Sequence, residues 1–465
     1  MRLKQHIHIL GICGTAMAAI ANLAKEAGFE VTGSDSGIYP PMSDYLESLD
    51  IQIRPFSLEN LEPAPDMVVI GNAMSRGNVE VEATLNLGLA YLSGPEFIGR
   101  YILPNRHAIV ATGTHGKTTT SSIIAHLLEE AGLNPGFMIG GIPENFDGGA
   151  RSGTGEHFVL EGDEYDTAFF DKRSKFLHYR ARTLILNNIE FDHADIFPDL
   201  ESIKTQFHHL IRTIPHAGNI IANSDDPNIT DLLSRGCWTP ITAFAQKGHQ
   251  SAEWQWEATS PDGSSFRLFR QGESVIEANW QMIGIHNVAN ACAVAAAATT
   301  LGIETATIKR AFESFSGIRR RMTLVGEARG IRVFDDFAHH PTAITGMVSA
   351  AKHAMKTDGK LWVIIEPRSN TMRTRIHQDR LPYCFNDADQ VIFAPAEDRN
   401  LEPHEVLDTA QVCRLIGDHA VALPDVESII EYIASGSAPG DDLLILSNGG
   451  FDGIHQRLLK RLLAH

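Results

Sequence analysis

The stretch that decides the fold is Ala111-Thr-Gly-Thr-His-Gly-Lys-Thr118. It follows the apolar run His107–Ala111, which reads as a strand, and it precedes a helical pattern over Thr118–Ala131. A strand, a glycine-containing turn and a helix in this order are typical of a P-loop, here with Ala111 where the first glycine usually lies. The stretch therefore predicts a phosphate-binding loop at the edge of a sheet.

Each residue type in this loop has a physical reason to be there. Gly113 and Gly116 let the backbone approach a phosphate and aim its N–H groups at the oxygens, while the helix N-terminus adds partial positive charge. Lys117 supplies a point charge for the β- and γ-phosphates, and Thr118 supplies a hydroxyl for Mg²⁺. The alternative interpretation is a chance glycine turn beside a surface lysine.

A Mg²⁺ ion at this loop needs further oxygen or imidazole ligands. Glu161 ends the predicted strand Phe158–Leu160, where an acidic partner is expected, although part of this acidic segment can also be a solvated loop. His193 follows the predicted strand Thr183–Leu186, at the end where ligands bind in α/β sheets. A lone histidine is more often structural, so this position alone is a weak indication.

A second glycine loop, Gly11-Ile-Cys-Gly14, joins the predicted strand His6–Leu10 to a helix over Thr15–Ala27. Cys13 and Ala16 stand where a dinucleotide fingerprint requires glycine, so NAD and an oxidoreductase are disfavoured. Asp35 lies 21 residues after Gly14, near the place of a ribose-binding acid. The loop therefore predicts a second phosphorylated ligand.

The length of 465 residues predicts about three domains. Strand and helix patterns alternate through most of the chain, which indicates α/β domains with parallel sheets. Residues 252–283 differ, because their aromatic and turn residues predict a small antiparallel insertion. The prediction is an N-terminal Rossmann-like domain, a central P-loop ATPase-like domain with that insertion and a C-terminal Rossmann-like domain, over residues 1–105, 106–322 and 323–465.

The composition excludes several classes of partner. A formal net charge of −18 disfavours nucleic acid and anionic membranes. The five cysteines are at least 29 residues apart, which removes CxxC zinc or redox motifs and a dense disulfide framework. No apolar run is long enough for a signal peptide or a membrane span, so a cytoplasmic location is expected.

The order of the motifs resembles that of the Mur ligase family, the ATP-dependent amide ligases of bacterial peptidoglycan synthesis, over the whole chain. The resembling segments are Gly113–Thr119, Glu161–Asp166, Asn188–His193, Gly284–Asn290, Gly317–Arg321 and Asp335–Pro341. Other segments resemble the branch that attaches an intact tripeptide more than the branch that adds L-alanine. These are Gly11–Thr15, Tyr39–Met42, Gly71–Gly77, Ser93–Pro95, Arg173–Phe176, Glu366–Met372 and Ser447–Phe451.

The resemblance implies a reaction. The lactyl carboxylate of UDP-N-acetylmuramate would attack the γ-phosphate of ATP and form an acyl phosphate. The amine of L-alanyl-γ-D-glutamyl-meso-diaminopimelate would then displace the phosphate and complete the amide. L-alanine as the acceptor is the runner-up within the family, and a P-loop protein that uses nucleotide hydrolysis for regulation is the alternative from another class.

The resemblance also implies roles for individual residues. The Mg²⁺ ligands would be Thr118, Glu161 and His193, and the catalytic residues Lys117, Glu161, His193 and Arg321. ATP would contact Gly113, Thr114, His115, Gly116, Lys117, Thr118, Thr119, Asn290, Arg321, Asp336 and His339. Without the family, Arg319–Arg321 can equally be a solvated basic linker and His339-His340 a capped turn.

Two further sets would hold the substrates. Candidates for the uridine diphosphate are Gly11, Cys13, Gly14, Thr15 and Asp35. Candidates for the tripeptide are Arg368, Asn370, Arg373 and Arg375, because its free carboxylates need cationic or amide partners.

Overall fold

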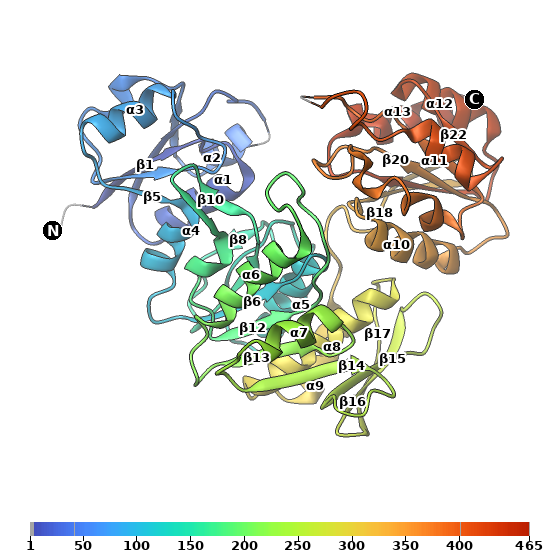
Figure 1. The fold of residues 1–465 in the computed structure, drawn as a ribbon, viewed down its shortest axis with the longest axis horizontal. Helices are drawn as coiled ribbons and strands as arrows, with labels where there is room; N and C mark the ends of the chain where they lie inside the picture. Colours follow the sequence, from blue (N-terminus) through green and yellow to red (C-terminus); the bar gives the residue numbers. More distant parts are fainter. Residues whose placement is uncertain (1–3, 41, 400, 465) are drawn as a thin grey trace.

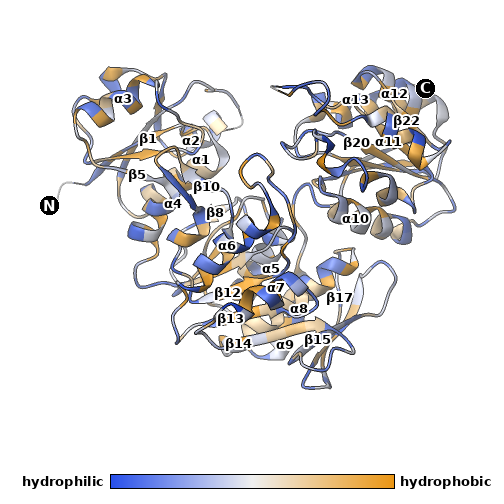
Figure 2. Ribbon diagram, in the orientation of Figure 1, coloured by the Kyte–Doolittle hydropathy of each residue, from blue (hydrophilic) through white to orange (hydrophobic). Residues whose placement is uncertain are grey.

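The computed structural model describes residues 4–40, 42–399 and 401–464; residues 1–3, 41, 400 and 465 lie outside the description. Three α/β units follow one another along the chain, each built on its own sheet (Figure 1). The predicted fold class is confirmed. Apolar residues, orange in Figure 2, lie along the strands of these sheets and on the inner faces of the helices. Among the described residues, no helix combines the length and apolar character that crossing a membrane requires.

The first unit is a five-stranded parallel sheet in the order β3-β2-β1-β4-β5. The order reverses direction between β1 and β4, and ligands of such sheets bind outside the carboxyl ends of the strands at this point. The loop 11–14 follows β1 directly. The elements are β1 His6–Leu10, α1 Thr15–Glu26, β2 Glu30–Ser34, α2 Met42–Ser48, β3 Gln52–Arg54, β4 Met67–Ile70, α3 Val79–Asn86, β5 Tyr91–Ser93 and α4 Gly94–Phe97.

A buried carboxylate organises one side of this unit. Glu80, in the first turn of α3, has no exposed surface. It accepts hydrogen bonds from the hydroxyl of Ser34 (2.5 Å), the backbone N–H of Ser57 (2.7 Å) and the amide of Asn60 (2.7 Å), and it lies 3.1 Å from His8 Nε2. Burial alone would raise the pKa of Glu80, but these donors hold it below the ordinary value.

The central unit contains a ten-stranded sheet in the order β17-β16-β15-β14-β13-β12-β6-β9-β7-β8. The strands predicted at 252–283 are antiparallel, as expected, but they continue the central sheet because β15 pairs with β14. The elements are β6 His107–Thr112, α5 Lys117–Glu130, β7 Gly136–Met138, β8 Ala150–Arg151, β9 His157–Gly162, β10 Asp166–Ala168, β11 Asp171–Ser174, β12 Thr183–Leu186, α6 Leu200–Ile211, β13 Asn219–Asn223, α7 Pro227–Ser234, β14 Ile241–Gln246, β15 Trp254–Ala258, β16 Ser265–Arg270, β17 Glu273–Asn279, α8 Ile285–Thr300 and α9 Thr305–Ser314.

The packing of α5 fixes the phosphate-binding loop. This helix lies against α8, whose buried residues 291–298 are mostly alanine. Small side chains allow the two helix axes to approach closely, and α5 buries all of its residues from 117 to 128. The chain leaves α5 at Gly132, which has a positive φ of +72° just beyond the helix and so serves as the predicted C-terminal stop.

The third unit is a six-stranded sheet in the order β18-β19-β23-β20-β21-β22, parallel except for the edge strand β18. Its central strands β20 and β23 are buried along their whole length. The elements are β18 Thr323–Ala328, β19 Ile331–Asp336, α10 Pro341–Ala354, β20 Leu361–Ile365, β21 Gln390–Phe393, α11 Thr409–Ile416, β22 Ala420–Ala422, α12 Val426–Gly436, β23 Asp442–Leu446 and α13 Ile454–Leu463.

Residues 315–322 connect the second and third units and contain three consecutive arginines, whose side chains have different partners. Arg319 faces Glu144 of the central unit, with 3.5 Å between Nε and Oε1. Arg320 belongs to the third unit, where it pairs with Asp335 (2.9 Å) and donates to the carbonyls of Ser447 and Gly449. The neighbouring arginines are therefore bound to different units. We call residues 315–322 the hinge segment.

We expect the Glu80→Gln substitution to destabilise the first unit by about 2 kcal/mol at pH 7, because the buried donors lose their charged acceptor. The folded-state pKa of Glu80 is lowered, so its contribution is full above about 4.5 and disappears as the pH falls through the folded value. The difference from wild type should therefore shrink below pH 4.5. Denaturant unfolding followed at pH 7 and in acid measures it.

The exposed Glu59→Gln is the matched control and should change stability little. Equal stability of wild type and Glu80→Gln at pH 7 would contradict the assignment.

Candidate active site

Three neighbouring strands bring the predicted residues together. In the central sheet β6 lies between β9 and β12, and the register pairs Ala111 with both Glu161 and Ile185. The loops that leave these three strands therefore meet at one edge. Within the first loop, Gly113 and Gly116 have φ values of +139° and +79°, which L-residues rarely adopt.

Gly116 is also in close contact with α8. A Cβ built on it would lie 2.8 Å from Oδ1 of Asn290, so the side chain of Asn290 closes over the phosphate-binding loop. The amide of Asn290 itself donates to Asn287 (3.2 Å). This explains why the loop requires glycine at this position, and it places the predicted residue Asn290 directly beside the loop.

Lys117, the first residue of α5, is buried among carboxylates. Its Nζ donates to the carbonyl of Gly113 at 2.9 Å and to Glu164 Oε2 at 2.9 Å, and it lies 3.8 Å from Asp163. Burial alone would lower the pKa of Lys117, but the carboxylates of Glu164, Asp163 and Glu161 raise it above the ordinary value. The lysine is therefore a permanent positive charge at the loop.

Thr118 and Glu161, two of the predicted Mg²⁺ ligands, are in contact. The hydroxyl of Thr118 donates to Glu161 Oε1 at 2.9 Å, and the backbone N–H of Gly140 donates to Oε2 at 2.8 Å. Burial raises the pKa of Glu161, and Asp163 raises it further. The pair places two oxygen donors side by side next to the phosphate-binding loop, which is the ligand chemistry that Mg²⁺ prefers.

His193 is held by a different carboxylate. Its Nε2 lies 2.9 Å from Oε1 of Glu164, and its ring packs on Tyr165 with 4.2 Å between centroids. Burial would lower the pKa of His193, but the bond to Glu164 raises it overall. Glu164 thus joins His193 to Lys117. Sequence reasoning quoted the acidic segment Glu161–Asp166 but selected only its first residue, although the density of carboxylates was the available signal.

A cavity of about 1610 Å³ lies between the second and third units. Its walls include most of the predicted ATP and metal residues, namely Thr114, His115, Gly116, Lys117, Thr118, Thr119, Glu161, His193, Asn290, Arg321, Asp336 and His339. His286 and His340 also line the cavity. The sequence did not single them out as site residues, although they lie in the family-like segments Gly284–Asn290 and Asp335–Pro341. Gly113 lies in the same loop, behind the Lys117 ammonium.

Three predicted residues enter the cavity from the hinge side. The guanidinium of Arg321 lies over the ring of Phe337, 5.0 Å from its centroid. Asp336 is buried and accepts the backbone N–H groups of Met322 (2.8 Å) and Ala338 (2.8 Å). His339 Nδ1 lies 2.9 Å from the carbonyl of Phe337. In this structure Asp336 therefore fixes the hinge segment, and Arg321 is the one of the three hinge arginines that lines the cavity.

The predicted uridine diphosphate residues form a separate group, and none of them lines that cavity. Gly14 and Thr15 are exposed at the N-terminus of α1, and Gly11 has a positive φ of +74°. The carboxylate of Asp35 accepts the backbone N–H groups of Cys13 (2.9 Å) and Gly37 (2.9 Å). Asp35 thus shapes the loop by holding its backbone.

The predicted tripeptide residues follow β20 and do not line the cavity either. Arg368 and Arg375 are exposed, whereas Arg373 is half-buried and donates to the carbonyl of Arg399 at 2.7 Å. Asn370 donates to Asp195 of the central unit at 2.7 Å. The structure therefore places Asn370 at the contact of the third unit with the segment that follows His193, whereas Arg373 is bound within the third unit.

Comparison with known families identifies all three units. The model described as "Mur ligase family, catalytic domain" matches residues 6–106, "Mur ligase middle domain" matches 111–298, and "Mur ligase, glutamate ligase domain" matches 320–449. The fold and the site thus define a ligase built around a P-loop. The chain belongs to the Mur ligase family.

Among its relatives, the UDP-N-acetylmuramate–L-alanyl-γ-D-glutamyl-meso-2,6-diaminoheptandioate ligase of Escherichia coli is 45% identical, with 98% of each chain covered. A UDP-N-acetylmuramate–L-alanine ligase of Acetivibrio thermocellus is 33% identical, over 98% of this chain and 96% of the relative. The crystal structure of a murein peptide ligase from Psychrobacter arcticus is 44% identical, covers 99% of both chains and has a TM-score of 0.74.

We expect the Gly116→Ala substitution to weaken nucleotide binding markedly, because its Cβ would displace the Asn290 side chain from the loop and its φ disfavours an L-residue. Gly132→Ala is the matched control. It lies at the opposite end of α5 with a φ of +72° and has open space around it. Both variants carry similar backbone strain, of order 1 kcal/mol. Titration with a fluorescent ATP analogue separates the two, and equal affinities would contradict the role of Gly116.

Proposed function

We propose that this chain joins L-alanyl-γ-D-glutamyl-meso-diaminopimelate to UDP-N-acetylmuramate at the expense of ATP, through an acyl phosphate. As a Mur ligase it is an ATP-dependent, amide-forming enzyme of peptidoglycan synthesis. The acceptor is inferred from the full-length identity of 45% to a ligase of that name, against 33% to an L-alanine ligase. The observation that carries the mechanism is the buried cationic centre of Lys117 at the mouth of the phosphate-binding loop.

The chemical obstacle in this reaction is charge repulsion. The lactyl carboxylate must approach the γ-phosphate of ATP, and both are anionic. Lys117 is held positive by the surrounding carboxylates, and Arg321 faces the same cavity from the hinge segment. We assign to these two cations the neutralisation of the phosphate charge as the P–O bond to ADP breaks and the acyl phosphate forms.

Mg²⁺ fits the donors that are present. Thr118 and Glu161 supply adjacent oxygens, and His193 lines the same cavity with its imidazole. A bound Mg²⁺ would supply further positive charge to the phosphates. Glu164 positions this set, since one carboxylate contacts both Lys117 and His193.

The remaining domains are assigned to the other ligands. We propose that residues 1–105 bind the uridine diphosphate at the N-terminus of α1, through the loop containing Gly11, Cys13, Gly14 and Thr15. Residues 106–322 would bind ATP, with Asn290 beside the loop and His339 opposite it. Residues 323–465 would present the tripeptide through Arg368, Asn370, Arg373 and Arg375. Closure of the third domain would exclude water from the acyl phosphate.

One experiment separates this proposal from its rivals. The protein is mixed with ATP, Mg²⁺ and UDP-N-acetylmuramate, and phosphate release is measured after adding the tripeptide or L-alanine singly. Release that depends on the tripeptide supports the proposal. Release that depends on L-alanine makes the chain an alanine-adding ligase, and release without any amine favours a nucleotide-dependent regulator.

We expect the Lys117→Ala substitution to lower tripeptide-dependent phosphate release about 10²-fold or more, because the buried charge that offsets phosphate repulsion is lost. Lys172→Ala is the control, since that lysine is exposed and pairs with Asp166. Near wild-type turnover in Lys117→Ala would exclude the assigned role, and melting curves of both variants establish that each is folded at the assay temperature.

A further inference from the structure

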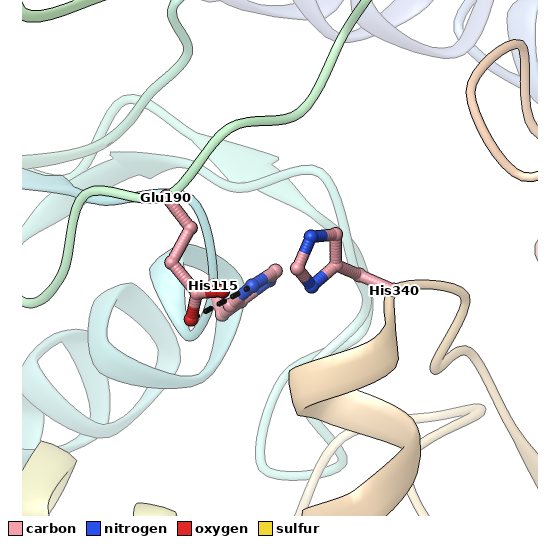
Figure 3. A group of neighbouring side chains, drawn as sticks. All are labelled: His115, Glu190 and His340. Atoms are coloured by element: carbon pink, nitrogen blue, oxygen red, sulfur yellow. Dashed lines mark ion pairs between the residues drawn. The ribbon is translucent and has the colours of Figure 1, made fainter. Parts of the chain in front are cut away.

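A second cluster of metal-ligating side chains lies where the phosphate-binding loop meets the third unit. His115 comes from that loop, Glu190 from the segment after β12, and His340 from the residue that caps α10 (Figure 3). One ligand atom from each residue lies within 4.8 Å of the others. None of the three belongs to the Thr118, Glu161 and His193 set.

The two imidazoles have lone pairs to offer. His115 Nε2 is buried, has no hydrogen-bond partner among the described residues, and faces Oε1 of Glu190 at 3.7 Å. The rings of His115 and His340 are 4.4 Å apart between centroids. Burial lowers the pKa of both, that of His340 to about 4, so both imidazoles are neutral at pH 7. A neutral imidazole is the form that binds a metal.

His340 is oriented for ligation by its neighbours. Its Nε2 lies 3.3 Å from the carbonyl of Phe191, and the tautomer that donates there leaves the lone pair on Nδ1. In this structure that lone pair accepts the backbone N–H of Thr342 at 3.3 Å and caps α10, so a metal ion on Nδ1 would replace that long hydrogen bond. Metal-binding histidines commonly donate their second N–H to a backbone carbonyl in this manner.

Glu190 turns one carboxylate oxygen, Oε1, towards His115. Its Oε2 accepts the hydroxyl of Thr342 at 2.7 Å and lies 3.7 Å from Arg380. These contacts hold the carboxylate at the domain boundary and leave Oε1 towards His115. The cluster thus offers two nitrogens and one oxygen, a donor set that suits Zn²⁺ or Co²⁺ better than Mg²⁺.

We propose that His115, Glu190 and His340 form a binding site for a borderline transition-metal ion of the Zn²⁺ class, which joins the phosphate-binding loop to the third unit. With bonds of about 2.0–2.1 Å, tetrahedral ligand atoms lie about 3.4 Å apart, so the three side chains must converge by roughly 1 Å. Water completes the coordination, and the bound ion holds the two units together.

The test is direct metal binding by the whole chain, measured without nucleotide or acceptor, so that its result does not depend on the proposed reaction. Zn²⁺ is titrated in competition with a chromophoric chelator, in millimolar Mg²⁺ that occupies the oxygen donors of Thr118 and Glu161. Co²⁺ is titrated in parallel, because its visible absorption reports the coordination geometry. We expect one ion per chain.

Two variants locate that ion. His340→Asn removes the imidazole and keeps an oxygen that can cap α10, and Glu190→Gln keeps the volume and the acceptor for Thr342. Each should weaken Zn²⁺ binding about tenfold or more. His353→Asn, at an exposed histidine of the same helix, should bind like the wild type.

No zinc binding by the wild type overturns the proposal. Unchanged affinity in either variant also overturns it, because the ion then lies elsewhere, for example between Glu164 and His193. Melting curves of both variants establish that the folded chain is being compared.

Discussion

The ion pair between Lys117 and Glu164 is the interaction on which the site depends. It connects the first residue of α5 with the strand-end segment after β9, and through the same carboxylate it reaches His193 in the loop after β12. Removing one partner would leave an unpaired buried charge, at a cost of about 3–5 kcal/mol. The three loops that define the central unit are therefore not independent. One carboxylate therefore holds both the lysine that we propose for the phosphates and the imidazole that we propose for Mg²⁺.

This arrangement answers the problem that the net charge of −18 poses for a protein with anionic ligands. Carboxylates crowd Lys117, yet they act by keeping it protonated, and Arg321 faces the cavity without an ion-pair partner recorded among the described residues. Over a Debye length of about 8 Å, such near charges outweigh those spread over the distant surface. The overall charge therefore constrains the macromolecular partners, while individual side chains determine what the cavity binds.

The sequence predicted elements that depend on neighbouring residues, and it did not predict contacts between residues far apart in the chain. The P-loop geometry, helix α5 to within one residue at each end, and the strands β1, β6, β9 and β12 follow from short-range periodicity and glycine placement, and they are confirmed. The link from Glu164 to Lys117 and His193 joins residues 47 and 29 positions apart, and no spacing rule encodes it. The strands at 252–283 were recognised as antiparallel, but their union with β14 depends on tertiary pairing. Likewise, the family resemblance selected Arg321 from the three adjacent arginines, but the residues alone did not show that the three have partners in two different units. The roles proposed for the uridine and tripeptide residues stay predictions.

The hinge segment carries a thermodynamic consequence of its own. Gly317, Arg320 and Met322 all have positive φ, and for the two L-residues this costs of order 1 kcal/mol each. The bonds of Arg320 to Asp335 and to two carbonyls of the third unit hold the segment in that conformation. The hinge segment is therefore a strained connection that its hydrogen bonds hold in one conformation, and not a flexible linker. A mutation that breaks the contacts of Arg320 would change the preferred orientation of the third unit without changing a contact with any ligand. Mutation can therefore alter the orientation of the domains independently of the chemistry of the cavity.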